Sequence, residues 1–254
     1  MTLEKYVPGE EQGAAFAAIS DMMRDFDIGQ SYADMMRYRI AGHAAIQCSD
    51  TYYVAHENGA ARSRLWMGWG RHPGAIGNWG NFYTDPRFRG RGIGRALLDF
   101  WFAHLRATKA LPRCFLCTTG SREITALYGE YGFRTALPGR EYGPLYLPIG
   151  DSPDTFAAFC EDYYRPSPLL YRRPATIGYR HEIDCLLRFA YTARGLAFGI
   201  GEMGWMDAAL LYAPERTEML FTPQGHCVGW GFDGQLQLHP LYRNAEIIKD
   251  KEMI

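Results

Sequence analysis

Residues 85–98 read Asp-Pro-Arg-Phe-Arg-Gly-Arg-Gly-Ile-Gly-Arg-Ala-Leu-Leu, and this stretch decides the fold. Pro86 ends a strand pattern, three alternating glycines form a turn, and apolar residues at helical spacing follow. The first backbone N–H groups of a helix have no partner inside the helix, and with the helix dipole they favour an anion. The pattern therefore predicts a strand, a turn and a helix, with a phosphate or pyrophosphate bound at Arg89–Arg95.

Arginines surround this turn at positions 87, 89, 91 and 95, although the formal net charge of the chain is -1. We interpret them as local charge complementarity to an anionic ligand. Spacing excludes two other phosphate-binding motifs. A Rossmann fingerprint would need glycine in place of Arg95, and the Gly-Lys-Ser/Thr of a Walker A loop is absent from the sequence.

The residues before the turn predict an antiparallel sheet that begins after a first strand and a helix. Asn58-Gly59 suits the positive φ angles of a tight hairpin turn. Gly80 lies inside a predicted strand, where glycine often marks a bulge or the close approach of a ligand. The predicted elements are a strand at Leu3–Val7, a helix at Gln12–Asp25, and strands at Tyr52–Ala55, Arg62–Trp69 and Asn78–Thr84.

The residues after the turn predict two helices, a strand and a hairpin. The first helix carries one apolar stripe, made by Ile93, Leu97, Leu98, Trp101, Phe102 and Leu105. Ser121 is a suitable N-cap for the second helix, and Gly132 a suitable end. Cys114 and Cys117 would point to opposite faces of a strand, so we expect buried thiols and no metal site. The predicted elements are a strand at Arg113–Thr118, a helix at Arg122–Tyr131 and a hairpin at Phe133–Ile149.

Three prolines within residues 165–174 predict a stiff connector, so we expect a first domain at 1–150, a helix and connector at 151–174, and a smaller α+β domain at 175–254. Gly68-Trp69-Gly70 recurs as Gly229-Trp230-Gly231, and residues 85–90 have a weaker copy at 239–244. This echo indicates either a degenerate repeat or chance similarity between aromatic strands. Glu246 and Ile248 stand where glycines 92 and 94 would fall, so the copy should not bind the same ligand.

Two motifs together resemble the GNAT superfamily of N-acetyltransferases. Arg89, Gly92 and Gly94 fit its signature of Arg or Gln, two residues, Gly, one residue, then Gly or Ala. Downstream, Tyr128 followed after three residues by Gly132-Phe133 fits the end of the next helix. Ser121 stands where the family often has Asn, which puts one polar contact in doubt. The resemblance covers roughly residues 50–135 and implies an α/β fold with a mixed (α+β) sheet.

The resemblance also implies how acetyl-CoA is held. The pyrophosphate would lie on the backbone amides of Arg89, Gly90, Arg91, Gly92, Ile93, Gly94 and Arg95. The pantetheine arm would pair like an extra strand with Phe82, Tyr83 and Thr84, and an N–H of Tyr83 or Thr84 would polarise the thioester carbonyl. Ser121 and Tyr128 complete the predicted cofactor contacts.

For catalysis the resemblance places Tyr128 near the sulfur as the acid that protonates the departing thiolate, with core packing as its alternative role. The base stays open between His72, Asn81 through an oriented water, and water leading to bulk solvent. Tyr32, Tyr38, Trp66, Trp69 and Tyr142 are candidate walls of an acceptor pocket or members of the core.

We therefore predict an acyltransferase that moves groups other than aminoacyl groups, here acetyl, to a primary amine of a small molecule or amino acid. A non-catalytic acyl-CoA sensor is the alternative. Composition indicates a globular protein, with 47% hydrophobic and 22% charged residues. The net charge argues against a general nucleic-acid binder, and the absence of a long apolar run predicts a cytoplasmic protein. The second domain could cover the acceptor site or form a homodimer interface.

Overall fold

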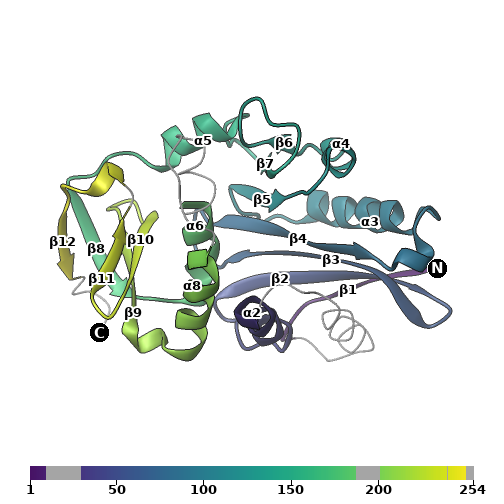
Figure 1. Ribbon diagram of the computed structural model, residues 1–254, viewed down its shortest axis with the longest axis horizontal. Coiled ribbons are helices and arrows are strands. Elements are labelled where there is room, and N and C mark those ends of the chain that lie inside the picture. The colour runs from purple at the N-terminus through teal and green to yellow at the C-terminus, as the bar shows by residue number, and fades with distance from the viewer. Residues whose placement is uncertain (10–29, 187–200, 239, 250–254) are drawn as a thin grey trace.

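The computed structural model describes residues 1–9, 30–186, 201–238 and 240–249, which form two mixed sheets with helices around and between them (Figure 1). The predicted α/β class with a mixed sheet is confirmed. The helix predicted at Gln12–Asp25 lies outside the described residues.

The first sheet has the strand order β1-β2-β3-β4-β5-β7-β6. The first part of the chain contains β1 (Thr2–Tyr6), α2 (Gln30–Ile40), β2 (Cys48–Glu57), β3 (Ala60–Gly70), β4 (Ile76–Thr84), a 3-10 turn (Pro86–Phe88), α3 (Ile93–Ala107), β5 (Cys114–Thr118), α4 (Arg122–Gly129), β6 (Arg134–Thr135) and β7 (Pro144–Pro148). Each strand and helix predicted between residues 52 and 135 is present. At the β2–β3 hairpin, Asn58 and Gly59 have φ angles of 54° and 76°, as the turn requires.

Strand β4 parts from β5 halfway along its length. The two strands pair in parallel only at Ile76, Gly77 and Asn78, whereas β5 goes on to pair with β7 as far as Thr118. Beyond Asn78, β4 follows β3 alone. Within this stretch Asn81 and Phe82 lie opposite the single residue Leu65, so β4 carries a bulge directly after Gly80.

The backbone at this bulge is held in an unusual conformation. Asn81 has a φ angle of 52°, and asparagine is one of the few residues that adopts this region at modest cost. The Arg64 side chain donates from Nε to the Asn81 carbonyl oxygen at 3.2 Å. The bulge turns β4 away from β5 and leaves one edge of its C-terminal half unpaired.

Two aromatic-rich cores lie on opposite faces of the first sheet. On the α3 face, Trp69, Trp79, Leu97 and Trp101 are buried, and Cys117 lies with them. The other face contributes to two further clusters, which include Trp66 and Cys114. The two cysteines therefore point to opposite faces, as predicted, and all six cysteines are buried free thiols.

The second sheet has the order β11-β10-β9-β8-β12. Its part of the chain contains α5 (Phe156–Tyr163), β8 (Leu169–Pro174), a 3-10 turn (Ile177–Tyr179), α6 (Arg180–Asp184), α8 (Gly201–Tyr212), a 3-10 turn (Pro214–Arg216), β9 (Thr217–Phe221), β10 (Cys227–Phe232), β11 (Gln235–Leu238), a 3-10 turn (Pro240–Tyr242) and β12 (Glu246–Lys249). Helices α6 and α8 lie between the two sheets (Figure 1).

Two local sequence predictions in this region need correction. Residues 165–174 are not a connector throughout, because Leu169–Pro174 forms β8, which pairs with both β9 and β12. A buried apolar side chain of β8 packs in the hydrophobic core. The strands that pair with β8 come later in the sequence, so the proline pattern does not predict a strand here. The helix expected from Asp151-Ser-Pro153 begins only at Phe156, where the Thr155 hydroxyl accepts from the Ala158 N–H at 3.3 Å.

The two sheets share a four-strand arrangement. Strands β1 to β4 and β8 to β11 are both antiparallel meanders. Helix α2 lies between the first two strands of the first meander, and helices α6 and α8 lie between those of the second. The Gly-Trp-Gly sequences lie in β3 and β10, and a 3-10 turn follows β4 and β11. The two sheets thus share this strand order, and the duplication itself stays a prediction. After the second turn comes β12 rather than a counterpart of α3.

An ion pair between α2 and β2 is buried on the face opposite α3. The Arg39 side chain donates to Asp50 from Nε at 3.1 Å and from Nη2 at 2.7 Å, and the Trp66 indole N–H donates to Asp50 Oδ1 at 2.8 Å. Both charged side chains are almost fully buried. Removal of one charge from such a pair leaves the other uncompensated in a poorly solvated place.

We expect Asp50→Asn to lower the free energy of unfolding by about 3–5 kcal/mol, because it leaves the Arg39 charge buried without its partner. Urea denaturation followed by tryptophan fluorescence would measure this loss. The matched control is Asp233→Asn, which breaks a pair with Arg216 in which both side chains are about half exposed. It should change stability by less than about 1 kcal/mol. Equal losses in the two variants would contradict the burial argument.

Candidate functional site

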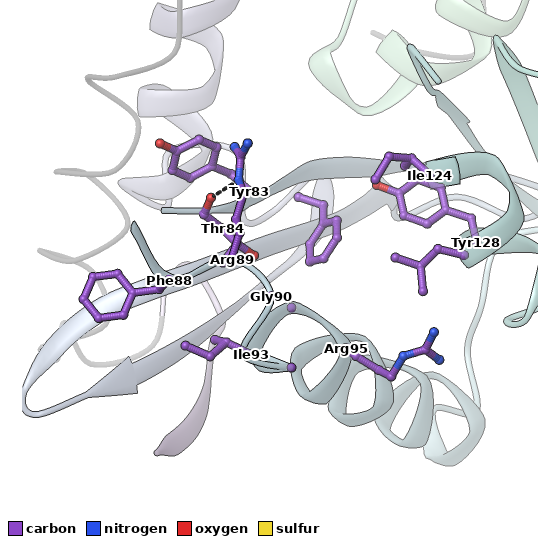
Figure 2. Close-up of a pocket in the computed structure, with 13 residues that line it drawn as sticks. Tyr83, Thr84, Phe88, Arg89, Gly90, Ile93, Arg95, Ile124 and Tyr128 are labelled. Atoms are coloured by element: carbon purple, nitrogen blue, oxygen red, sulfur yellow. Dashed lines mark hydrogen bonds between the residues drawn. The ribbon is translucent and has the colours of Figure 1, made fainter. Parts of the chain in front are cut away.

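A cavity of about 570 Å³ lies between the C-terminal end of β4, the glycine-rich turn and helix α4 (Figure 2). Its size falls in the range of small-molecule sites. Its lining consists of Phe82, Tyr83, Thr84, Phe88, Arg89, Gly90, Gly92, Ile93, Gly94, Arg95, Ile124, Leu127 and Tyr128. Of the residues predicted to hold the cofactor, the cavity gathers all except Arg91 and Ser121.

The glycines of the turn keep the start of α3 open. Gly90 and Gly92 have φ angles of 74° and 77°, and a side chain on either would meet no atom within 4 Å. Gly92 is the N-cap of α3, with no side-chain hydrogen bond to the first turn of the helix. At Gly94 a methyl group would come within 3.0 Å of the Phe82 ring and the Thr84 hydroxyl. Glycine thus lets α3 lie close to β4 while its N-terminal amides face the cavity.

The arginines around the turn are mostly neutralised by neighbouring carboxylates. Arg87 pairs with Asp85 at 2.7 Å, Arg91 with Glu57 at 3.2 Å and Arg95 with Glu130 at 2.5 Å. The local positive charge is therefore smaller than the sequence suggests. These pairs are exposed and can exchange partners when a ligand arrives.

Arg89 differs from the other three arginines. Among the described residues it has no carboxylate partner, and its Nε donates to the Thr84 carbonyl oxygen at 3.0 Å. Its guanidinium also lies 5.8 Å from the centre of the Tyr83 ring. Arg89 thus joins the turn to the end of β4 and brings an uncompensated positive charge to the cavity (Figure 2).

The open edge of β4 faces the same cavity. The Asp85 N–H donates to the Arg62 carbonyl oxygen on the β3 side at 2.9 Å. Because successive residues of a strand turn their N–H groups to opposite edges, the Thr84 N–H points away from β3 and the Tyr83 N–H points toward it. Of the two donors that the sequence offers for the thioester carbonyl, only that of Thr84 lies on the unpaired edge.

Tyr128 projects from α4 into the cavity and is only 6% exposed. Burial raises the pKa of its phenol above the ordinary value, and the neighbouring Cys117 raises it further. The hydroxyl therefore stays protonated at neutral pH and can donate. The Trp79 ring meets the Tyr128 ring edge to face at 4.6 Å, so the position of the phenol is fixed by packing.

Ser121 has a structural role in the described protein. Its hydroxyl caps α4 and accepts from the Ile124 N–H at 3.3 Å, as the sequence predicts. It is not part of the cavity lining. The cap places the first turn of α4, and through it Ile124, at the cavity wall.

The structure does not bring His72 to the cavity. This histidine lies between β3 and β4, about 20 Å along β4 from Phe82 at the usual rise of a strand. Its Nε2 lies 3.2 Å from the buried carboxylate of Glu182, and its ring stacks on Tyr179 at 4.0 Å. The structure therefore does not bring His72 together with the other predicted site residues. A contact with a residue 110 positions later could not be read from the sequence.

Asn81 lies on the other side of the sheet from Tyr128. Its Oδ1 is 3.5 Å from the Tyr32 hydroxyl of α2, and its buried Nδ2 has no hydrogen-bond partner among the described residues. The candidate aromatic walls also separate. Trp66 and Trp69 are core residues on opposite faces, whereas Tyr38 and Tyr142 are exposed.

Sequence reasoning missed two carboxylates of α6 that brace β4 just before it parts from β5. Glu182 Oε1 accepts from the Ile76 N–H at 2.7 Å. Asp184 Oδ2 accepts from the Asn78 side-chain amide at 3.2 Å. Both carboxylates are buried. The second part of the chain thus fixes the point at which the open edge begins, and no local pattern around residues 182–184 signals this.

The structure contains a bulged strand that leaves its parallel neighbour, followed by a glycine turn and the open start of a helix, which is the arrangement that the resemblance to the GNAT superfamily implies. Residues 48–135 match the family model of the acetyltransferase (GNAT) domain, which spans this unit from β2 to β6. The match identifies a GNAT domain at residues 48–135, which is one part of the chain.

Solved structures with this fold are similar over more than half of the chain. One is the GNAT family N-acetyltransferase YhbS from Escherichia coli in complex with CoA. It has 16% identity over 59% of this chain and 82% of that chain, with a TM-score of 0.41. Another is a GNAT family acetyltransferase from Brucella melitensis in complex with acetyl-CoA, at 19% identity over 59% and 89%, with a TM-score of 0.41. A third is the ribosomal-protein-S18-alanine N-acetyltransferase from Escherichia coli, at 15% identity over 60% and 97%, with a TM-score of 0.40.

No curated protein matches the chain in sequence. Among the helices that the structure describes, none combines the length and apolar composition needed to cross a bilayer. The described residues also hold no group of three or more side chains suited to a metal ion.

We expect Arg89→Ala to weaken acetyl-CoA binding about tenfold, because it removes the one cation of the turn that lacks a carboxylate partner in the described structure. Isothermal titration calorimetry at constant ionic strength would give the dissociation constants. Arg87→Ala is the matched control, since Arg87 is exposed and engaged by Asp85. A larger effect of Arg87→Ala than of Arg89→Ala would contradict this assignment of charge.

The His72–Glu182 pair predicts a pH dependence of stability. Burial opposes the charged imidazole, but the hydrogen bond and negative charge of Glu182 outweigh it and raise the pKa of His72. A raised pKa in the folded state stabilises the protein fully below the unfolded value of about 6.5, and the stabilisation is lost as pH rises through the folded pKa. The difference in unfolding free energy between the native protein and His72→Gln should therefore shrink above about pH 6.5. Urea denaturation at a series of pH values would show it; a difference that grows with pH would refute the assignment.

Proposed function

We propose that the protein transfers an acetyl group from acetyl-CoA directly to a primary amine of a small molecule or amino acid. The observation that supports this most strongly is the single cavity lined by the open helix start, the unpaired end of β4 and the Tyr128 phenol. Each of these three features serves a different part of a CoA thioester. They come from elements that the chain places together by folding.

The residues present fit acetyl-CoA. The amides from Arg89 to Arg95 and the charge of Arg89 suit the pyrophosphate, and the positive φ angles of Gly90 and Gly92 keep side chains out of its way. The free N–H of Thr84 suits a carbonyl oxygen of the thioester arm. Ser121, which caps its own helix, is left out of this set.

The side chains that line the cavity near Tyr128 indicate that the transferred acyl group is short. Phe82, Ile124 and Leu127 line this end of the cavity with Tyr128. Behind them Trp79 packs against both the Phe82 and Tyr128 rings, and it is only 2% exposed. A filled aromatic core at this end leaves little room for a long chain.

Acyl transfer to an amine forms a C–N bond and breaks the C–S bond of the thioester, so a proton must leave the amine and one must reach the sulfur. Tyr128 holds a proton whose pKa is raised by burial, and it can donate a hydrogen bond to a developing thiolate. The N–H on the open edge at Thr84 can stabilise negative charge on the carbonyl oxygen.

For the proton of the amine, Asn81 is the better candidate once His72 is set aside. Its unpartnered Nδ2 and the nearby Tyr32 hydroxyl are suited to orient a water on the face opposite α3. Removal of the proton through this water to bulk solvent needs no carboxylate on β4. The acceptor would then approach from the face of the sheet that carries α2.

The helices that cover this face of the first sheet indicate that the acceptor amine is small. Helix α6 contacts β3 and β4, and α2 contacts α8. The Tyr212 hydroxyl of α8 donates to Asp34 of α2 at 2.6 Å, which closes the outer side. A broad groove for a polypeptide is harder to accommodate beneath such a cover than a small amine. The cytoplasmic location and the homodimer suggested by sequence stay predictions.

The main rival is a protein that binds acyl-CoA without turnover, which is favoured by the lack of a carboxylate base on β4. Release of free thiol from acetyl-CoA, followed with a panel of small amines, separates the two. We expect Tyr128→Phe to lower kcat about 100-fold while acetyl-CoA still binds, because the variant lacks only the proton donor.

The matched control is Tyr131→Phe. Tyr131 is equally buried near the end of α4, but its hydroxyl donates to Asp99 at 2.7 Å and it does not line the cavity. It should keep its turnover within about threefold, consistent with loss of one peripheral hydrogen bond. Tight binding without turnover on any amine would support the sensor. Equal losses in both tyrosine variants would remove Tyr128 from the mechanism.

A further inference from the structure

A second cavity of about 470 Å³ lies where the beginning of β5 meets the second sheet. It shares no lining residue with the first cavity and lies at the opposite end of β5 from the open edge. Four segments form it: the residue before β5, the end of α5, the chain leading to β8, and the β9–β10 turn. The lining residues are Arg113, Asp162, Tyr163, Arg165, Pro166, Ser167, Pro168, Thr222, Pro223, Gln224 and His226.

The formal charges of the side chains that line this cavity do not sum to zero. Arg113 Nη2 lies 2.7 Å from one oxygen of Asp162, and Arg165 Nη2 lies 2.6 Å from the other. One carboxylate is therefore shared between two guanidinium groups, and both hold down the pKa of Asp162. The lining keeps an excess of one positive charge even when His226 is neutral. Each guanidinium has more donors than the single one it gives to Asp162.

His226 is held in one tautomer. Its Nδ1 is 2.8 Å from the Tyr163 carbonyl oxygen, and because a carbonyl can only accept, Nδ1 carries the proton. The ring stacks on Tyr163 at 4.1 Å, which fixes its orientation. In the neutral form Nε2 is then a bare acceptor, with no hydrogen-bond partner among the described residues. Burial lowers the pKa of His226; the Tyr163 carbonyl and Asp162 oppose this, and Arg113 and Arg165 add to it.

We propose that this cavity binds a small organic oxyanion, a carboxylate or a phosphate ester, and that His226 takes up a proton at Nε2 when the anion binds. The anion would neutralise the excess charge of Arg113 and Arg165. Protonation turns Nε2 from an acceptor into a donor, so it can bond to an anion oxygen; the proton comes from solvent. Pro166, Pro168 and Pro223 form apolar walls for the body of the ligand. The inference does not rest on the transferase activity.

The test is a histidine titration by NMR on the full chain, with His226 assigned by comparison with His226→Gln. We expect inorganic phosphate or acetate to raise the pKa of His226, and binding to be about fivefold tighter at pH 6 than at pH 8. Sodium chloride at the same ionic strength is the control. An effect of phosphate alone identifies a phosphate ester as the ligand class, and an effect of acetate as well includes carboxylates.

Two variants with opposite expected effects on anion affinity distinguish binding at this cavity from a general effect of salt. Arg165→Gln removes an exposed cation, and it should weaken phosphate binding about fivefold without unfolding the protein. Asp162→Asn removes the shared carboxylate, and it should strengthen binding by a similar factor. The proposal is overturned if chloride shifts the titration as much as the oxyanions do, or if the two variants change affinity in the same direction.

Discussion

The parting of β4 from β5 after Asn78 is the constraint on which the candidate active site depends. A strand that pairs on both sides has no amide to offer a ligand, whereas β4 keeps one edge free from the bulge to Thr84. The same divergence makes room for the start of α3 and for Tyr128. The bulge is held by the Arg64 contact with the Asn81 carbonyl, and the pairing before it by Glu182 and Asp184 of α6. The bulge in the first sheet and the contacts from α6 therefore both determine where β4 parts from β5.

Local sequence rules predicted the glycine turn and the elements around it, and they failed on the contacts made by distant residues. The glycine turn, the cap at Ser121 and the bulge near Gly80 each depend on neighbours within a few residues, so their patterns survive in the sequence. His72 was misplaced because its environment is set by Glu182, far along the chain. The charge of the turn was overestimated because Glu57 and Glu130 approach it only through folding. The proline pattern of residues 165–174 hid a strand whose partners come later in the sequence.

The second sheet has the same four-strand order as the first, but its described residues contain no counterpart of the glycine turn and α3. Where glycines 92 and 94 precede a helix in the first copy, Glu246 and Ile248 lie in β12, which pairs with β8. A strand at this place has no exposed helix start to offer a phosphate. What the second part contributes instead is burial and the two carboxylates of α6 that contact β4. The candidate cofactor site and the contacts that brace it thus come from different parts of the chain.

The buried cysteines have a consequence for a protein that would work beside a free thiol. Thiol exchange and spontaneous acyl capture both require an accessible thiolate. All six sulfur atoms lie in the interior, and burial raises the pKa of Cys48 to about 11 and those of Cys114 and Cys117 further. The native chain should therefore resist mixed disulfides with coenzyme A and should not acylate itself through sulfur. Product accumulation would leave its covalent state unchanged.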